Sequence, residues 1–163
     1  MTKREAVFSK DMENRKLSVV RLFDAPLAQV WKAWTTAEIL DLWWAPKPYK
    51  AETKIMDFVE GGRWIYCMLG PEGYRTWCRV DYNTIALHQT ITSKVMFCDE
   101  QGNENLDFPI MNWKKKFLQT DGSTTVNIEI TFDKMEDMEA ILTMGFQEGF
   151  TAGLDSLDQY LDS

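Results

Sequence analysis

The side chains of this sequence best suited to acid–base, nucleophilic or metal chemistry are one histidine and three cysteines. His88 is the only histidine, so no histidine pair can bind a metal, and a catalytic triad would have to use this residue. It lies in Leu87-His-Gln-Thr-Ile91, a strand-like pattern in which we expect a structural or surface histidine. If it points inward near Arg79 or Asp81, it could act as an acid or base on a bound carbonyl compound.

The three cysteines, Cys67, Cys78 and Cys98, lack the spacing of a metal site, and their odd number argues against a disulfide framework. We interpret them as small buried hydrophobic residues in a reducing compartment. The sequence has no glycine-rich phosphate loop, nucleophile elbow or metal motif. We therefore predict no cofactor, no metal and no catalytic residue, and the sequence favours binding over catalysis.

Aromatic residues are abundant, at 13% of the chain with 7 tryptophans, and such rings fill a core or line a site for an apolar ligand. The candidate ligand-binding residues are Trp44, Trp64, Tyr66, Met68, Arg79, Trp113, Phe117, Phe146, Gly149 and Phe150. Arg79 or Tyr66 would supply the polar contact that orients the ligand. The alternative interpretation is a filled aromatic core that binds nothing.

The elements that must position these residues follow a simple order. A strand over 17–23 precedes two short helices, a run of antiparallel strands, and a long terminal helix from about Met135 to Tyr160. A sheet with one polar face must cover its apolar face, and only the last helix is long enough to do so. The pattern predicts an α+β fold in which a curved antiparallel sheet wraps around that helix. We expect residues 1–16 to be a mobile arm and 17–163 to be one domain.

Three glycines recur every four residues in the predicted terminal helix, so Gly145, Gly149 and Gly153 would share one face. A glycine inside a helix costs roughly 0.5–1 kcal/mol relative to alanine. The stripe fits either a very closely packed sheet or a cavity, and the sequence leaves both open.

Charge is distributed unevenly along the chain, whose net charge is -7. From Asp133 onward, eight acidic residues stand against Lys134 alone. They form either a solvated helix face or an acidic surface for a basic partner, which charge reversal at Asp155 and Asp158 would test. Residues 114–116 are lysines, which we expect to flank an exposed strand where they discourage edge pairing. No other basic cluster stands out, which disfavours nucleic acid as a partner.

Membrane insertion is not indicated by the hydropathy of the chain. No apolar run approaches the roughly 18 residues of a membrane span, and residues 1–16 lack the apolar region of a signal peptide. We therefore expect no membrane span and a cytoplasmic location.

Several short motifs occur in a fixed order along the chain: Arg21-Leu-Phe-Asp-Ala-Pro26, Val30-Trp-Lys-Ala-Trp-Thr35, Leu42-Trp-Trp-Ala-Pro46, Gly61-Gly-Arg-Trp64, Met68-Leu-Gly-Pro-Glu-Gly73 and Gly145-Phe-Gln-Glu-Gly149. With these motifs the chain resembles the family named for an activator of the heat-shock-protein-90 ATPase. That family belongs to the START-related, birch-pollen-allergen-like (SRPBCC) superfamily. The resemblance covers about residues 17–161 and implies the helix-grip fold.

The functions implied by the resemblance are diverse, because the superfamily includes lipid and hormone carriers, polyketide cyclases and ring-oxygenase subunits. We expect a cavity for a small apolar or amphipathic ligand between the sheet and the terminal helix. The alternatives are a chaperone-interacting module, which could also bind a second copy of itself, and a cyclase-like enzyme. Four residues match family positions that we assign to packing: Arg21, Trp31, Trp34 and Trp43.

Overall fold

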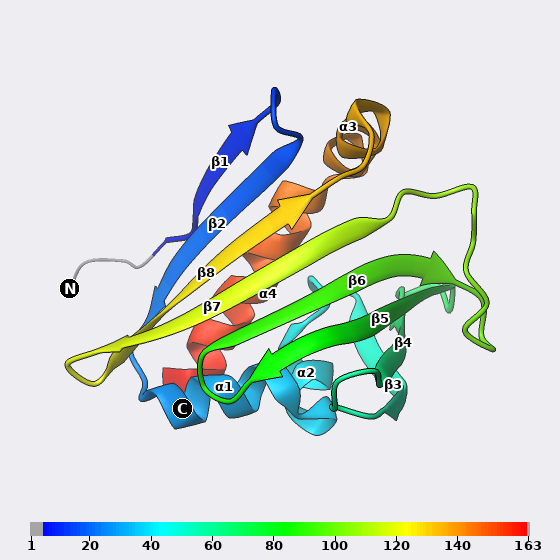
Figure 1. The fold of residues 1–163 in the computed structure, drawn as a ribbon. Helices are drawn as coiled ribbons and strands as arrows, with labels where there is room; N and C mark the ends of the chain where they lie inside the picture. Colours follow the sequence, from blue (N-terminus) through cyan, green and yellow to red (C-terminus); the bar gives the residue numbers. More distant parts are fainter. Residues whose placement is uncertain (1–4, 163) are drawn as a thin grey trace.

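Residues 5–162, the part that the computed structural model describes, form one antiparallel sheet of eight strands and four helices (Figure 1). The strands are β1 (Val7–Asp11), β2 (Lys16–Phe23), β3 (Lys50–Met56), β4 (Arg63–Leu69), β5 (Arg75–Ala86), β6 (Thr90–Cys98), β7 (Met111–Thr120) and β8 (Ser123–Thr131). The helices are α1 (Leu27–Thr35), α2 (Ala37–Trp43), α3 (Met135–Thr143) and α4 (Phe146–Asp162). Within this described part, no helix is both long enough and apolar enough to cross a membrane.

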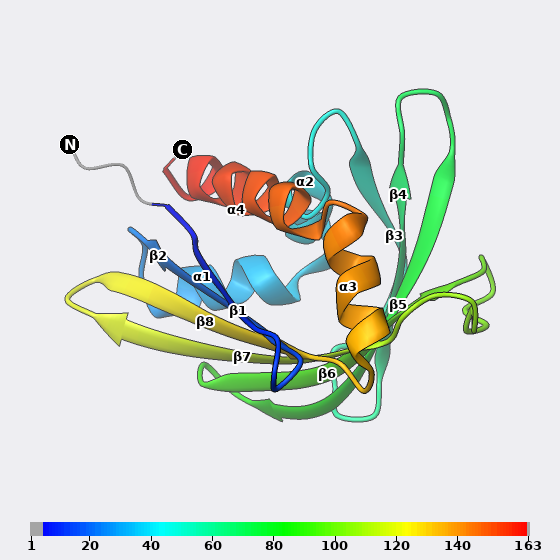
Figure 2. The same ribbon diagram turned by 90° about the horizontal axis from the view of Figure 1, so that it is seen from above.

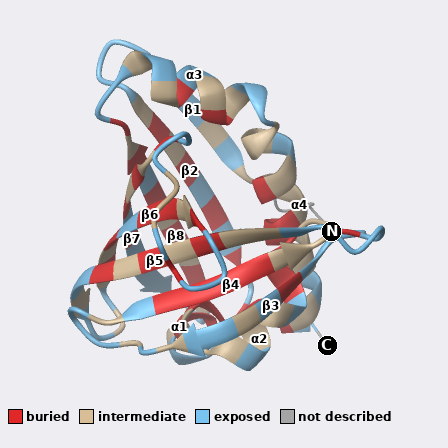
Figure 3. Ribbon diagram, turned by 90° about the vertical axis from the view of Figure 1, so that its right-hand side faces the viewer, coloured by how far each residue is buried: buried red, intermediate tan, exposed pale blue. Residues whose placement is uncertain are grey.

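The sheet has the order β1-β2-β8-β7-β6-β5-β4-β3 and curves around the helices. Figure 2 shows all the helices on its concave side, with α4 lying over that face. Along β2, β7 and β8, buried positions alternate with less buried ones, whereas residues 64–67 of β4 are all buried. Figure 3 shows the burial of each element. In β8, for example, Val126, Ile128 and Ile130 are buried on the concave face. The predicted α+β helix-grip fold is confirmed.

The N-terminal segment differs from the mobile arm that the sequence predicted. Residues 7–11 form β1, which pairs with β2 from Val7 opposite Val20 to Asp11 opposite Lys16. An edge strand has one neighbour and exposes many of its side chains, so its polar sequence does not reveal it. Residues 1–4, also part of the predicted arm, lie outside the described residues.

The predicted single terminal helix is two helices. Gly145 separates α3 from α4 and has a φ of +88°, in the left-handed region that favours glycine at the end of a helix. Its amide donates a hydrogen bond to the carbonyl oxygen of Leu142 at 3.1 Å. Gly145 is therefore a helix-ending residue, and only Gly149 and Gly153 remain inside a helix.

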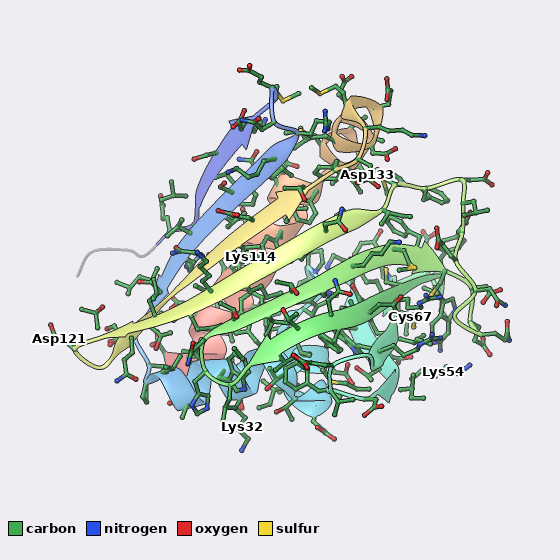
Figure 4. All side chains as sticks on the ribbon, viewed as in Figure 1. Lys32, Lys54, Cys67, Lys114, Asp121 and Asp133 are labelled. Atoms are coloured by element: carbon green, nitrogen blue, oxygen red, sulfur yellow. The ribbon has the colours of Figure 1, made fainter. Side chains whose placement is uncertain are left out.

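The lysines of residues 114–116 do not flank an edge strand, because β7 lies in the interior of the sheet between β6 and β8. Lys114 and Lys116 are exposed, and Figure 4 labels Lys114 on β7. The alternation of a strand places Lys115 on the opposite, concave face, where it is only 6% exposed. One cation of this basic run is thus buried in the interior.

Candidate functional site

A cavity of about 270 Å³ lies between the concave face of the sheet and the junction of α3 and α4. Strands β4 to β7 contribute the sheet side, and the segment after α2 (44–49) closes another side. Tyr49 and Met144 line the cavity and are 47% and 53% exposed, so the cavity is open to solvent.

Seven of the ten candidate residues predicted from the sequence line this cavity. They are Trp44, Tyr66, Met68 and Trp113 on one side, and Phe146, Gly149 and Phe150 of α4 on the other. Aromatic rings pack against one another along the wall. The rings of Phe146 and Phe150 stack with centroids 5.4 Å apart, and Trp113 meets Phe150 edge-on at 5.4 Å.

The other three candidates, Trp64, Phe117 and Arg79, lie outside the cavity lining. Trp64 is buried behind the wall, where its ring stacks on Tyr66 at 4.2 Å. Phe117 lies farther along β7 and packs against Trp31 at 4.9 Å. Neither side chain reaches the cavity, so both belong to the core around it.

Arg79 is on the outer face of the sheet, because its neighbour Cys78 points into the cavity. Its guanidinium donates hydrogen bonds to both carboxylate oxygens of Asp81, at 2.9 and 2.7 Å, and to the carbonyl of Gly102 at 2.7 Å. The Arg79 hydrogen bonds lower the pKa of Asp81. Arg79 therefore does not supply the polar contact expected of it, and Tyr66 remains the candidate.

Polar groups in the cavity wall are neutral near pH 7. The Tyr66 hydroxyl accepts a hydrogen bond from the indole nitrogen of Trp44 at 2.8 Å, and burial raises its pKa well above the usual value. Burial also raises the pKa of the Cys78 thiol to about 12. Among the described residues, none that lines the cavity carries a formal charge. The site suits an apolar molecule with a small polar group.

The two glycines inside α4 have different roles: one permits close packing and the other borders the cavity. A Cβ atom at Gly153 would lie 3.1 Å and 3.2 Å from the carbonyl oxygens of Trp44 and Trp43, so this glycine permits close packing. A Cβ atom at Gly149 would meet only Pro46 Cγ at 3.6 Å, an ordinary contact. Gly149 lines the cavity, and its missing side chain leaves that space open.

Lys115 is the interior residue that the sequence interpretation missed. Its ammonium nitrogen lies 5.2 Å, 5.7 Å and 5.5 Å from the ring centroids of Trp34, Trp44 and Trp113. The alternation of Trp113, Lys115 and Phe117 was the available signal, since two aromatic residues at a period of two mark a buried face.

The catalytic arrangement considered for His88 is not assembled. His88 lies in the turn between β5 and β6 with a φ of 60°, and its ring packs against Trp31 at 5.6 Å. Asp81 is opposite Lys94 and Arg79 opposite Met96, farther from the turn along the same strand pair. Within residues 5–162, no group of three or more His, Cys, Asp or Glu residues could hold a metal ion.

Comparison with known families gives one match. The model of the family described as "Activator of Hsp90 ATPase homolog 1-like protein" matches residues 24–162. The chain belongs to this family. No curated protein matches it.

Solved structures show the same fold over nearly the whole chain. The crystal structure of protein Ms6760 from Mycobacterium smegmatis is 25% identical, with a TM-score of 0.88 over 96% of both chains. A solution structure from Arthrobacter aurescens is 28% identical, with a TM-score of 0.90 over 96% of this chain and 91% of that one. CalU16 from Micromonospora echinospora, at 15% identity and a TM-score of 0.60 over 98% of this chain and 87% of that one, shares the fold alone.

Proposed function

We propose that this member of the family binds a small apolar or amphipathic molecule, without covalent chemistry, in the cavity between the sheet and α4. The observation that carries the proposal is the cavity itself, about 270 Å³ in volume and lined by uncharged, mostly apolar side chains. Pockets of this composition hold ligands by burying apolar surface, and a few polar groups fix the orientation. The Tyr66 hydroxyl and the Cys78 thiol are two of the polar groups in the lining that could take that role.

Gly149 gives the proposal its sharpest test, because a side chain at this position would project into the ligand space. We predict that Gly149→Leu abolishes ligand binding with a modest loss of stability. Gly149→Ala is the matched control: it makes one ordinary contact with Pro46 and should retain binding.

The measurement is a thermal-shift screen of the wild-type protein against a broad panel of apolar and amphipathic small molecules. A ligand at a hundred times its dissociation constant adds about 2.7 kcal/mol, which raises the melting temperature of a chain of this size by roughly 5–10 °C. Hits of related structure that vanish in Gly149→Leu but persist in Gly149→Ala support the proposal. A flat screen, or hits that Gly149→Leu leaves unchanged, contradicts it.

A second candidate function is binding to a basic surface of a chaperone, which the family description suggests. It is favoured by the exposed acidic side chains of α3 and the start of α4, among them Glu136, Glu139 and Glu148. Such contacts weaken as salt screens them, so binding at low ionic strength that is lost at high salt supports this function.

We propose the cytoplasm as the compartment, since all three cysteines are free and buried.

A further inference from the structure

Lys115 lies next to the cavity, on the far side of its aromatic wall. Three indole rings surround its ammonium group, and two of them, Trp44 and Trp113, also line the cavity. Trp113 precedes Lys115 by two residues on β7, so both side chains project from the same concave face. The positive charge therefore lies against two of the rings that form the cavity wall.

No ion pair within residues 5–162 neutralises Lys115. Burial lowers the pKa of its ammonium group to about 8, so the group is still mostly charged at pH 7. A buried charge is normally paired with an opposite charge, and the faces of the indole rings compensate it only in part. The structure thus contains a buried cation that lacks a counter-ion.

Other unpaired hydrogen-bonding groups surround this cation. Among the described residues, the Ser93 hydroxyl and the indole nitrogens of Trp34 and Trp113 are buried and have no hydrogen-bond partner. Ser93 is directly opposite Trp113 in the β6–β7 register, and it faces the interior beside Lys115. All of these groups can donate a hydrogen bond, and the indole and ammonium groups can only donate.

We infer that the cavity binds an amphipathic carboxylate, whose apolar body packs against Phe146 and Phe150 and whose carboxylate binds the Lys115 ammonium and the Trp113 indole nitrogen. This inference rests on the proposed function and specifies its ligand class. A carboxylate accepts several hydrogen bonds, so it would neutralise the ammonium and satisfy the unpaired donors together. Its single negative charge also matches the single cation.

Other ligand classes fit the site less well. A cationic ligand would meet Lys115 with no acidic residue in the described wall to compensate. A neutral ligand would leave the ammonium without a counter-ion. A phosphate monoester carries close to two negative charges at pH 7 and would bring one more than Lys115 can neutralise. The rings of Trp44 and Trp113 must move apart for the carboxylate to reach Lys115.

The test compares three probes that share one apolar body: 2-naphthoic acid, its methyl ester and 2-naphthalenemethanol, each titrated calorimetrically into the full-length protein at pH 7. The acid should bind roughly 10- to 100-fold more tightly than the other two, because a hydrogen bond to a charged group contributes more than a neutral one. Lys115→Met should abolish this preference, and Lys115→Arg should keep part of it. The control is Lys116→Met, which removes an exposed lysine from the outer face and should leave the preference intact.

The possible outcomes separate this inference from the function on which it rests. Equal binding of all three probes to the wild-type protein overturns the carboxylate and leaves the apolar cavity supported. If none of the probes binds, the inference is contradicted, and the thermal-shift screen with the Gly149 variants tests the proposed function separately. If Lys115→Met loses all three probes equally while its near-ultraviolet circular dichroism stays native, Lys115 shapes the cavity and does not select a charge, which also overturns the inference.

Discussion

The space between the sheet and α4 is filled at one end and hollow at the other. At the filled end, Gly153 brings the helix against the carbonyl oxygens of Trp43 and Trp44, where a Cβ atom would be only 3.1–3.2 Å away. At the hollow end, one turn earlier in the same helix, Gly149 borders the cavity. The comparison shows that glycines four residues apart serve opposite purposes, and that the neighbouring backbone decides which.

Two buried cations of the described residues, Arg21 and Lys115, also differ, because one forms ion pairs and the other does not. The Arg21 guanidinium, whose side chain is 2% exposed, lies 2.8 Å from Asp155 and 3.6 Å from Asp158, so α4 itself neutralises it. Lys115 has aromatic rings around it and no ion pair among residues 5–162. Arg21 thus stabilises the docking of α4, whereas Lys115 contributes no ion pair to the packing of the described residues.

The largest effect should come from removing the acids that pair with Arg21. The double variant Asp155→Asn, Asp158→Asn leaves a buried cation uncompensated and should lower the free energy of unfolding by about 2–4 kcal/mol, as measured by urea denaturation. Charge reversal at these two positions would therefore test folding, and not the partner binding for which the sequence suggested it. Glu136→Gln with Glu139→Gln is the control, and an equal loss there would contradict the assignment.

An intermediate effect of opposite sign should come from Lys115→Met. Because burial lowers the pKa of Lys115 from 10.5 to about 8, the charged form is unfavourable in the folded state. At pH 7 both states hold the proton, so the penalty is fully present and the variant should be more stable by about 1–3 kcal/mol. Between pH 8 and 10.5 only the unfolded state keeps the proton, so wild-type stability rises and the advantage of the variant shrinks.

Urea denaturation at pH 7 and pH 10 measures this difference, with Lys116→Met as the control. The other titratable groups of the interior face are present in both proteins and cancel in the comparison; they are Arg21 on β2, Tyr66 on β4, Cys78 and Tyr82 on β5, and Asp155 and Asp158 on α4. A variant less stable than the wild type at pH 7 would mean that packing of the lysine stem outweighs the buried charge.

The smallest effect separates the two glycines. Gly149→Ala should raise stability by about 0.5–1 kcal/mol, because alanine favours the helix and meets only an ordinary contact. Gly153→Ala should lower stability by about 1 kcal/mol, since its Cβ atom would press on two backbone carbonyl groups that cannot rotate away. Thermal denaturation of the two single variants measures both, and changes of the same sign would contradict the division into a filled and a hollow end.

Much of the fold could be predicted from local patterns, because strands such as β2, β7 and β8 show their buried face through alternation. Val126, Ile128 and Ile130 show it in β8, and the family motifs gave the order of the elements. The break at Gly145 could not be predicted in this way. A glycine inside a helix and a glycine that ends one look alike in sequence, and the difference is a backbone angle.

The candidate site was predicted in part, and its errors arise from strand pairing over long distances. Tyr66 is opposite Cys78 in the register, so Cys78 shares the cavity face and its neighbour Arg79 cannot. Lys115 was missed because the three consecutive lysines were interpreted as part of an exposed edge strand, although the alternation of Trp113, Lys115 and Phe117 indicated a buried face. Only strand pairing shows that β7 lies in the middle of the sheet. Both errors concern which face or which neighbour a strand acquires, information that resides in the partner strand.

Trp44 takes part in both ends of the interior, with a consequence for how a ligand can reach Lys115. Its carbonyl oxygen faces Gly153, which fixes its backbone against α4, while its ring forms part of the cavity wall and bonds to Tyr66. The ring can therefore rotate about its side-chain torsions while the backbone of Trp44 stays in place. Side-chain rotation is faster than the hinge motion of a helix or domain. We expect a carboxylate to reach Lys115 by rotation of this indole together with that of Trp113, with α4 remaining on the sheet throughout.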